Sequence, residues 1–488
     1  MVEKKRSICL FCSLGCGTMF RTAGEHVLAI DYDRDNPVNQ GSLCPRGNYN
    51  FELLNNPCRL AEPQIGKRKA SWRETIDLLR RRFMEFDPDS VGIVVSSLSS
   101  NEDACLAAKL AGQLGTKNIA AAADPADLEA YAGSKWEAEG AKLARIEKMG
   151  KEEALLIIGD VLTRSPVLAK RVNQVKYGKR GNRVTVIDPN QTHTSWFATT
   201  HLKNQPGTEA LVLAAILKVV SEESGKARID LNLEKVSKTV GIPQEVLVKA
   251  ARDFNAAASG TIIFVPRETI ARNDLCAYFA RMLASLSPNK KYITCYGFGN
   301  TLGVNTILDG MVSGHLSSAD LLKKVEGGQL KALLILGEDL AASHPELEKR
   351  IRGLELVAMS NYFLTPLTDD ALTLLPLASH LENSASYTLA DGRRERIDAA
   401  APKVGTMSNA EIIAALLGDK VDLGQADQEA KAVVEKGVPS DKAELKQKLS
   451  EAQKITARKD APELNITHFG NNRLVRNFFW YRVNNKHG

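Results

Sequence analysis

Four cysteines near the amino terminus have the spacing of a metal-cluster site. They follow the pattern Cys9-x2-Cys12-x3-Cys16-x27-Cys44. Three of the thiols fall within eight residues and the fourth returns after a long excursion, so four sulfurs can meet at one centre. Thiolates select iron–sulfur clusters, zinc or copper(I), and a set of four suits a [4Fe–4S] cluster or a structural zinc ion. The pattern predicts these cysteines as ligands of one metal centre.

The spacing favours an iron cubane over zinc. Zinc ribbons carry paired Cys-x2-Cys knuckles, whereas only Cys9 and Cys12 form such a pair here. Gly15 and Gly17 flank the third cysteine, where they allow the backbone to bend sharply around an inorganic core. One [4Fe–4S] cluster is the first interpretation, and a zinc-stabilised structural scaffold without a redox role stays as an alternative.

The composition is typical of a globular protein with several domains. A chain of 488 residues exceeds what one core usually organises, so two to four domains are expected. Hydrophobic residues make up 44% and charged residues 25%, and a net charge of +6 is small for this length, which argues against nucleic-acid binding. We find no apolar run long enough for a membrane span and no export signal, so we expect no membrane insertion. The remaining cysteines are not spaced as a disulfide framework, which indicates a reducing cytoplasm; they are Cys58, Cys105, Cys276 and Cys295.

Elements that could position such a centre alternate along the rest of the chain. Residues 18–40 alternate apolar and polar side chains, as in a small antiparallel sheet. Short apolar, β-branched runs then alternate with amphipathic stretches, which predicts parallel strands separated by helices. The fold class predicted is α/β, with a small N-terminal iron–sulfur module, two doubly wound lobes and a C-terminal extension. The predicted strands lie at 91–97, 154–160, 183–189, 261–265, 292–296 and 332–338.

The cysteine segment resembles the N-terminal iron–sulfur module of the molybdopterin oxidoreductase superfamily. The resemblance rests on residues 7–16, then Asp31-Tyr32-Asp33, then Gly41-Ser42-Leu43-Cys44-Pro45-Arg46-Gly47. It is strongest to the formate dehydrogenase catalytic subunit and to the large iron–sulfur subunit of NADH–quinone oxidoreductase. In that family a basic residue two positions after the fourth cysteine lies between cluster and pterin. Arg46 matches that position, which implies a place near the cluster.

Turns in the two lobes resemble the pterin-binding lobes of the same superfamily. The order of matches runs from about residue 7 to about residue 415 and includes later turns such as Gly337-Glu338-Asp339. In such enzymes these turns hold the guanine nucleotide ends of the cofactor. Each turn alone is also typical of a helix cap or a strand end, so the site implied is either vestigial or functional. Its candidate residues are Gly159, Asp188, Pro206, Gly207 and Thr208.

The resemblance and the element pattern together give domain boundaries. We expect 1–60 to form the iron–sulfur module, 61–125 with 260–375 the first α/β lobe, and 126–259 the second lobe. Residues 376–420 are expected to return and pack near the module. Residues 421–488 are expected to form a tail of charged, solvent-facing helices and an aromatic-basic segment at 465–482. That segment is interpreted either as a docking segment or as a strand folded back on its own lobes.

The chain departs from the family where the catalytic metal ligand is expected. The loop at 120–127 reads Ala-Ala-Ala-Ala-Asp-Pro-Ala-Asp, without a thiol or a histidine. Cys105 lies back within a helix and is interpreted as a structural thiol, while Asp124 and Asp127 are interpreted as helix caps. The chain also ends before the family's C-terminal barrel would be complete. We therefore expect no catalytic residue here, and we do not expect molybdopterin guanine dinucleotide, although it stays open.

The first hypothesis is an iron–sulfur electron-transfer subunit of a multi-subunit redox complex. Its lobes would act as a non-catalytic scaffold, and its partners would be a flavoprotein, ferredoxin-like iron–sulfur proteins, or both. The second hypothesis is a molybdenum or tungsten bis-pterin oxidoreductase of the formate dehydrogenase type, with an atypical metal ligand or a cap domain supplied by a partner. The zinc scaffold is the third.

Overall fold

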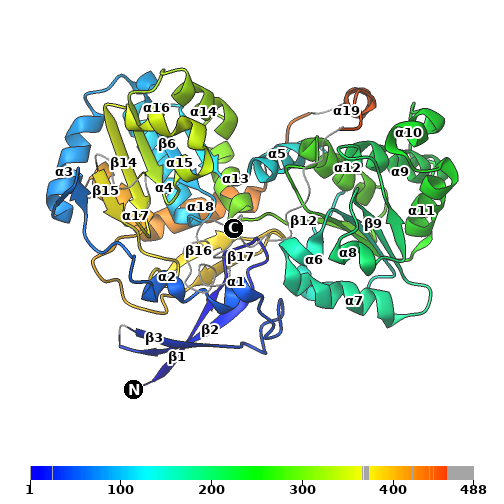
Figure 1. Ribbon diagram of the computed structural model, residues 1–488, viewed down its shortest axis with the longest axis horizontal. Helices are drawn as coiled ribbons and strands as arrows, with labels where there is room; N and C mark the ends of the chain where they lie inside the picture. The colour runs from blue at the N-terminus through cyan, green and yellow to red at the C-terminus, as the bar shows by residue number, and fades with distance from the viewer. Residues whose placement is uncertain are drawn as a thin grey trace.

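A small antiparallel sheet begins the chain and lies below the junction of two α/β lobes (Figure 1). The computed structural model describes residues 2–24, 26–364, 367, 373–418, 421–438, 440–442 and 444–458. The first sheet has the order β1-β2-β3, with Ile8 paired to Gly17 at the end nearest the cysteines. Two short helices follow it. These elements are β1 (Glu3–Ile8), β2 (Gly17–Ala23), β3 (His26–Asp31), α1 (Pro45–Asn48) and α2 (Glu52–Asn55).

The first lobe is built on a seven-stranded sheet in the order β5-β4-β15-β14-β13-β6-β7. The five strands from β15 to β7 are parallel and fully buried, while β4 and β5 form an antiparallel edge. These parallel strands are rich in valine, leucine, isoleucine and alanine because helices cover both of their faces. The strands are β4 (Gln64–Ile65), β5 (Arg68–Lys69), β6 (Val91–Ser96), β7 (Ile119–Ala122), β13 (Ala332–Leu336), β14 (Leu356–Asn361) and β15 (Thr373–Pro376).

Two groups of helices cover this sheet. One group packs against the side chains of Ile93, Leu334 and Ala358; it comprises α3 (Trp72–Phe83), α4 (Asn101–Leu114), α13 (Thr301–Met311), α17 (Asn409–Leu417) and α18 (Leu423–Lys436). The other group packs against the alternate side chains of the same strands; it comprises α14 (Ser318–Glu326), α15 (Leu340–Ser343) and α16 (Glu348–Arg352).

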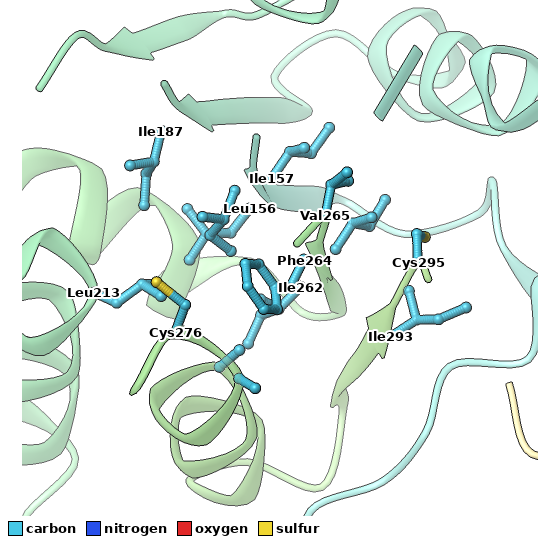
Figure 2. Close-up of a cluster of buried hydrophobic side chains, with 14 of the residues drawn as sticks. Leu156, Ile157, Ile187, Leu213, Ile262, Phe264, Val265, Cys276, Ile293 and Cys295 are labelled. Carbon is cyan, nitrogen blue, oxygen red and sulfur yellow. The ribbon is translucent and has the colours of Figure 1, made fainter. Parts of the chain in front are cut away.

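The second lobe is built on a five-stranded parallel sheet in the order β10-β9-β8-β11-β12. Figure 2 shows its core, where Leu156, Ile262 and Phe264 of the strands lie near Leu213 and Cys276 of the flanking helices. The strands are β8 (Ala154–Ile158), β9 (Arg183–Ile187), β10 (Thr200–Leu202), β11 (Gly260–Phe264) and β12 (Lys290–Thr294). The helices are α5 (Pro125–Ser134), α6 (Val161–Arg164), α7 (Ala169–Gly178), α8 (His193–Trp196), α9 (Glu209–Glu223), α10 (Leu233–Val240), α11 (Gln244–Ala256) and α12 (Asn273–Ser285).

Two strands after the predicted boundary at residue 260, β11 and β12, belong to a different lobe from the one predicted. Strand β11 pairs in parallel with β8, with Ile262 opposite Leu156, and β12 pairs with β11. Both strands therefore belong to the second lobe, and the chain re-enters the first lobe only after β12. The α/β class with an antiparallel N-terminal module and two doubly wound lobes is confirmed.

The chain after the first-lobe sheet returns to the cysteine module. A hairpin of β16 (Ala385–Thr388) and β17 (Arg394–Ile397) lies between the lobes and above the N-terminal sheet (Figure 1). At its turn the backbone N–H of Ala390 donates to the carbonyl of Ser13, at 3.0 Å. The return segment thus holds the cysteine loop against the lobes.

The C-terminal helices pack on the lobes, which differs from the solvent-facing prediction. Ala426 and Ala430 of α18 are fully buried against α4. Helix α19 (Leu445–Gln453) packs on α9, and its Glu451 forms a 2.7 Å ion pair with Arg272. The aromatic-basic segment at 465–482 lies outside the described residues. Across the part of the chain that is described, no helix has the length and apolar character needed to cross a bilayer.

Both large sheets reverse their strand order once. In the second lobe the chain runs from β8 outward to β10 and then returns to β11 on the other side of β8. In the first lobe it runs from β6 to β7 and then returns to β13 on the other side of β6. Crevices at such switch points, at the carboxyl ends of the strands, are where open α/β sheets bind ligands.

Candidate iron–sulfur and cofactor site

The first three cysteines lie in the loop that joins β1 to β2. The backbone N–H of Cys9 donates to the carbonyl of Cys16 at 2.8 Å, which closes the loop that carries the thiols. Gly15 has φ +64°, and a Cβ there would lie 2.2 Å from a methyl of Leu389. Glycine is therefore needed at this position for both backbone conformation and space. Cys44 arrives from the other side as the residue before helix α1.

All four predicted cysteines line one pocket of about 310 Å³, part of which is open to solvent. Cys9, Cys12 and Cys16 are buried, and Cys44 is half-buried. Burial raises the pKa of the three buried thiols, and the neighbouring cysteines raise it further. Metal binding to cysteine releases the thiol protons, so a bound metal centre would replace them in this pocket.

The pocket fits a cluster by the chemistry of its donors. Four sulfurs surround a shared space, which is the donor set of a [4Fe–4S] cubane. Within the described ranges we find no group of three or more His, Cys, Asp or Glu side chains placed to hold a single metal ion.

Arg46 joins this pocket to the second lobe. Its side chain is buried, and Nη1 donates to the carbonyl of Phe11 in the cysteine loop at 3.0 Å. Its Nη2 donates at 2.5 Å to the carbonyl of Arg164, the last residue of α6. The positive charge of Arg46 also lowers the pKa of Cys12 against the effect of burial. The residue therefore stabilises thiolates and contacts the loop after β8 at the same time.

Gly159 and Asp188 lie together at the switch point of the second lobe. Gly159 follows β8 with φ +90°, and a Cβ there would lie 3.0 Å from the carbonyl oxygen of Val265. Asp188 follows β9, is fully buried, and accepts from Nη2 of Arg267 at 2.7 Å. Burial raises the pKa of Asp188, and Arg267 opposes that rise. Backbone and side chains from three strands thus converge at one edge.

The Pro206-Gly207-Thr208 turn opens helix α9 at the same edge. Gly207 has φ +80°, and its Cα approaches Arg458, whose Cγ would lie 3.1 Å from a Cβ. Thr208 is fully buried, and its hydroxyl donates to the carbonyl of Gln205 at 2.7 Å. Pro206 accepts a backbone bond from Arg458 at 2.9 Å. The turn is therefore held by its own loop and by the last described residue of the chain.

Two residues of this edge were missed by the sequence analysis. Both carboxylate oxygens of Glu209, and Nε and Nη1 of Arg267, are buried without a hydrogen bond of good geometry among the described residues, although the side chain of Asn204 and the charge of Arg267 lie near the carboxylate. Burial raises the pKa of Glu209, and the charge of Arg267 opposes this. Glu209 directly follows the predicted turn and Arg267 comes three residues after β11, so their positions after a turn and a strand were the available signals.

The loop in place of a catalytic metal ligand contains an ion-paired cluster. Asp124 occupies the predicted N-cap position of helix α5, but its side chain makes no capping hydrogen bond and forms an ion pair with Arg164 instead. Asp127 is fully buried and accepts from the backbone N–H of Gly297 at 2.7 Å. Burial raises the pKa of Asp127 to about 7, with Arg164 opposing the rise. Cys105 lies apart from this loop, buried within α4, with Sγ 3.8 Å from Oε2 of Glu429.

Comparison with known proteins gives a family and a fold. Residues 2–56 match the model of the molybdopterin oxidoreductase Fe4S4 domain, and residues 59–418 match the model of molybdopterin oxidoreductase. The alpha subunit of F420-dependent formate dehydrogenase 2 from Methanococcus maripaludis is 26% identical over 478 residues, covering 86% of this chain and 70% of that protein. The F420-dependent formate dehydrogenase alpha subunit of Methanocaldococcus jannaschii is 25% identical over 477 residues, with the same coverage.

A solved structure has the same fold. Acetylene hydratase from Pelobacter acetylenicus superposes with a TM-score of 0.63 at 14% identity, over 87% of this chain and 70% of that one. The order of the elements, the cysteine module and the two family matches lead to one assignment. The chain belongs to the molybdopterin oxidoreductase family and carries that family's Fe4S4 domain at residues 2–56.

Proposed function

We propose that the protein is a formate dehydrogenase-type redox subunit that holds a [4Fe–4S] cluster and a pterin guanine nucleotide cofactor. Cys9, Cys12, Cys16 and Cys44 are the proposed cluster ligands. The nucleotide end of the cofactor is proposed to lie at the second-lobe edge. The relatives favour this reading over the electron-transfer scaffold preferred from sequence, and the family match favours a molybdopterin cofactor that the sequence analysis did not expect.

The observation that carries the proposal is the contact made by Arg46. One buried guanidinium touches the cysteine loop at Phe11 and the end of α6 at Arg164. Helix α6 begins directly after Gly159 and Asp160 at the switch point. Cluster pocket and cofactor edge are thus separated by a single short helix. This arrangement brings a one-electron carrier close to a site of two-electron chemistry.

Residues at the second-lobe edge suit a nucleotide. The unpartnered carboxylate of Glu209 can accept from ring and amino N–H groups of a base, and the free N–H groups of Arg267 can donate to oxygen. Gly159 and Gly207 let the ligand approach the backbone closely. A bound molybdenum or tungsten pterin supplies two-electron chemistry on the substrate. The protein's own part is to orient the cofactor, exclude water and carry electrons past Arg46.

Formate is the substrate proposed, because relatives are named as formate dehydrogenases. Its oxidation to carbon dioxide releases one proton and two electrons. We propose that these electrons leave one at a time through the cluster to a flavoprotein or ferredoxin-like partner. Cys44 is the least covered of the four proposed ligands, so its side of the cluster is the proposed exit.

A second candidate is the electron-transfer scaffold without a metal centre. The observation that favours it is the ion pair of Arg164 with Asp124 and the proximity of Asp127, at 3.5 Å. The guanidinium of Arg164 pairs with the carboxylates of Asp124 and Asp127, which lie in the loop at 120–127 where the resemblance implies a metal ligand. In that case the cluster would relay electrons between partners and the lobes would only mount it.

Metal and pterin analysis of anaerobically purified protein separates the candidates. About four iron atoms per chain with molybdenum or tungsten, extractable pterin and formate-dependent reduction of an artificial acceptor support the first. Iron without pterin or heavy metal supports the scaffold and overturns the first. Zinc without iron overturns both and supports the structural alternative.

A further inference from the structure

A hydroxyl of the second lobe faces the cysteine pocket. Ser165 follows helix α6, and its backbone N–H donates to the carbonyl of Val161 at 2.8 Å. The residue is fully buried and lines the same pocket as Cys12. Its Oγ makes no hydrogen bond to nitrogen or oxygen among the described residues; the acceptors near it are the thiols of Cys12 and Cys295. A buried hydroxyl without a partner is costly, so the geometry calls for an acceptor inside the pocket.

A further buried cysteine, Cys295, directly follows β12 and precedes the residue that docks the cysteine loop. It is fully buried, with its backbone N–H donating to the carbonyl of Phe264 at 2.8 Å. The carbonyl of the next residue, Tyr296, accepts from the backbone N–H of Ser13 at 3.1 Å. That bond docks the cysteine loop, at the residue after Cys12, onto the end of β12.

The electrostatic environment agrees with this placement. Burial raises the pKa of the Cys295 thiol, and the charge of Cys12 raises this pKa further. A hydrogen bond from the hydroxyl of Ser165 lowers the pKa of both thiols. Both Cys295 and Cys276 belong to the same hydrophobic core, Cys295 at the end of β12 next to Ile293 and Cys276 on α12 (Figure 2). Cys12 is among the causes of the raised pKa of Cys295 but is not among the main causes for Cys276. Two buried cysteines of one lobe are thus in different surroundings.

We propose that Ser165 and Cys295 are hydrogen-bond donors to the cluster sulfur at Cys12 and that they raise the reduction potential of the cluster. Neither residue is a ligand. Reduction adds negative charge to the cluster and its thiolates, and an O–H or S–H donor stabilises that charge. The inference rests on the proposed ligand role of Cys12, and it adds residues from two second-lobe loops that control the cluster from outside its own module.

The test is a redox titration of the full-length protein, purified anaerobically and followed by electron paramagnetic resonance. Ser165→Ala and Cys295→Ala should each keep the wild-type iron content and shift the midpoint potential to a more negative value. The double variant should shift it further. Cys295→Ser, which restores a donor at the same place, should move the potential back toward wild type.

Cys276→Ala is the matched control, because it removes a buried thiol of the same lobe that lies away from the cluster. Its potential should equal that of the wild type. Unchanged potentials in both donor variants with full iron content would overturn the donor roles while leaving the cluster assignment intact. Loss of iron from Cys295→Ala but not from Cys276→Ala would make Cys295 a ligand and also overturn its donor role. A wild-type protein without iron would overturn the cluster itself.

Discussion

The carboxyl edges of the two parallel sheets have the same topology but different hydrogen bonding. In the first lobe the N–H of Gly337 donates to Oγ of Ser360 at 2.9 Å, and that hydroxyl donates to Oδ1 of Asn409 at 2.6 Å. Asn409 in turn donates to Oγ of Ser99 at 3.3 Å. Asn409 opens helix α17 of the return segment, so the chain itself completes this edge.

The second-lobe edge keeps polar atoms that its own chain does not satisfy. Glu209 and Arg267 both have buried atoms without a partner in the described residues. Native proteins leave few such groups, and those that occur call for a ligand, a water or a catalytic role. The first-lobe edge is bridged by the return segment, although Oγ of Ser97 lacks a partner there, whereas the second-lobe edge leaves a carboxylate and guanidinium nitrogens unpartnered among the described residues. The ligand proposed for the second-lobe edge would lie on the lobe that Arg46 contacts.

We call the second-lobe edge the open edge and the first-lobe edge, bridged by Asn409, the closed edge. The largest effect is expected at the cysteine pocket, next to the open edge. Cys44→Ala removes one proposed cluster ligand, so the iron content should fall from about four atoms per chain to a degraded or absent cluster. The lobes should stay folded, because their cores are separate from Cys44. Iron analysis and circular dichroism measure both. Cys58→Ala, at an exposed thiol, is the control and should keep its iron; full iron content in Cys44→Ala would remove it from the ligand set.

The next effect is expected at the open edge itself. Arg267→Ala leaves the buried carboxylate of Asp188 without its partner, which should cost about 3–5 kcal/mol of stability. It should also reduce the guanine nucleotide that co-purifies. Thermal unfolding and nucleotide analysis after acid hydrolysis give the two readouts. Arg252→Ala removes an exposed arginine of the same lobe and should change neither. Equal nucleotide content in both variants would contradict a ligand at this edge.

A smaller effect, of a different kind, is expected at the closed edge. Asn409→Ala removes an acceptor for Ser360 and a donor to Ser99, so it should destabilise the first lobe by about 1–3 kcal/mol. Its nucleotide content should stay that of the wild type. Asn289→Ala, at an exposed asparagine, should leave stability unchanged. Loss of nucleotide from Asn409→Ala would mean that both edges bind the ligand.

The smallest effect concerns pH. Burial raises the pKa of Glu209 in the folded state above its ordinary value, which the unfolded state keeps. At a pH between the unfolded and the folded pKa, the folded state therefore holds a proton that the unfolded state has released. Stability should therefore fall as pH rises through this window. Glu209→Gln should show a shallower fall in the midpoint of thermal unfolding. Glu222→Gln lies near the other end of α9, where Lys218 lowers the carboxyl pKa, and should keep the wild-type fall. A wild-type slope in Glu209→Gln would place the titration elsewhere.

Sequence patterns sufficed for the features that local residues determine. The cysteine spacing, the buried strand runs and the resemblance around Arg46 predicted the module and the α/β lobes. The membership of β11 was not predictable in this way, because a buried parallel strand has the same composition whichever sheet it joins. Its place depends on pairing with β8, more than 100 residues earlier.

The remaining differences have the same origin in long-range contacts. Ala426 and Ala430 sit in a charged stretch that looks solvent-facing, yet their small side chains let α18 approach α4 closely. Asp124 precedes a helix and looks like a cap, but its carboxylate pairs with the guanidinium of Arg164, which lies at the end of α6, 40 residues later. Arg267 acquires its importance only because the fold brings Asp188 and Glu209 beside it.

The most direct test is joint analysis of iron and guanine nucleotide in the anaerobically purified full-length protein. With the cysteine pocket and the second-lobe edge both occupied, we predict about four iron atoms per chain together with guanine nucleotide released by acid hydrolysis. Protein that carries its full iron content but releases no guanine nucleotide would contradict the assignment of the open edge to a cofactor.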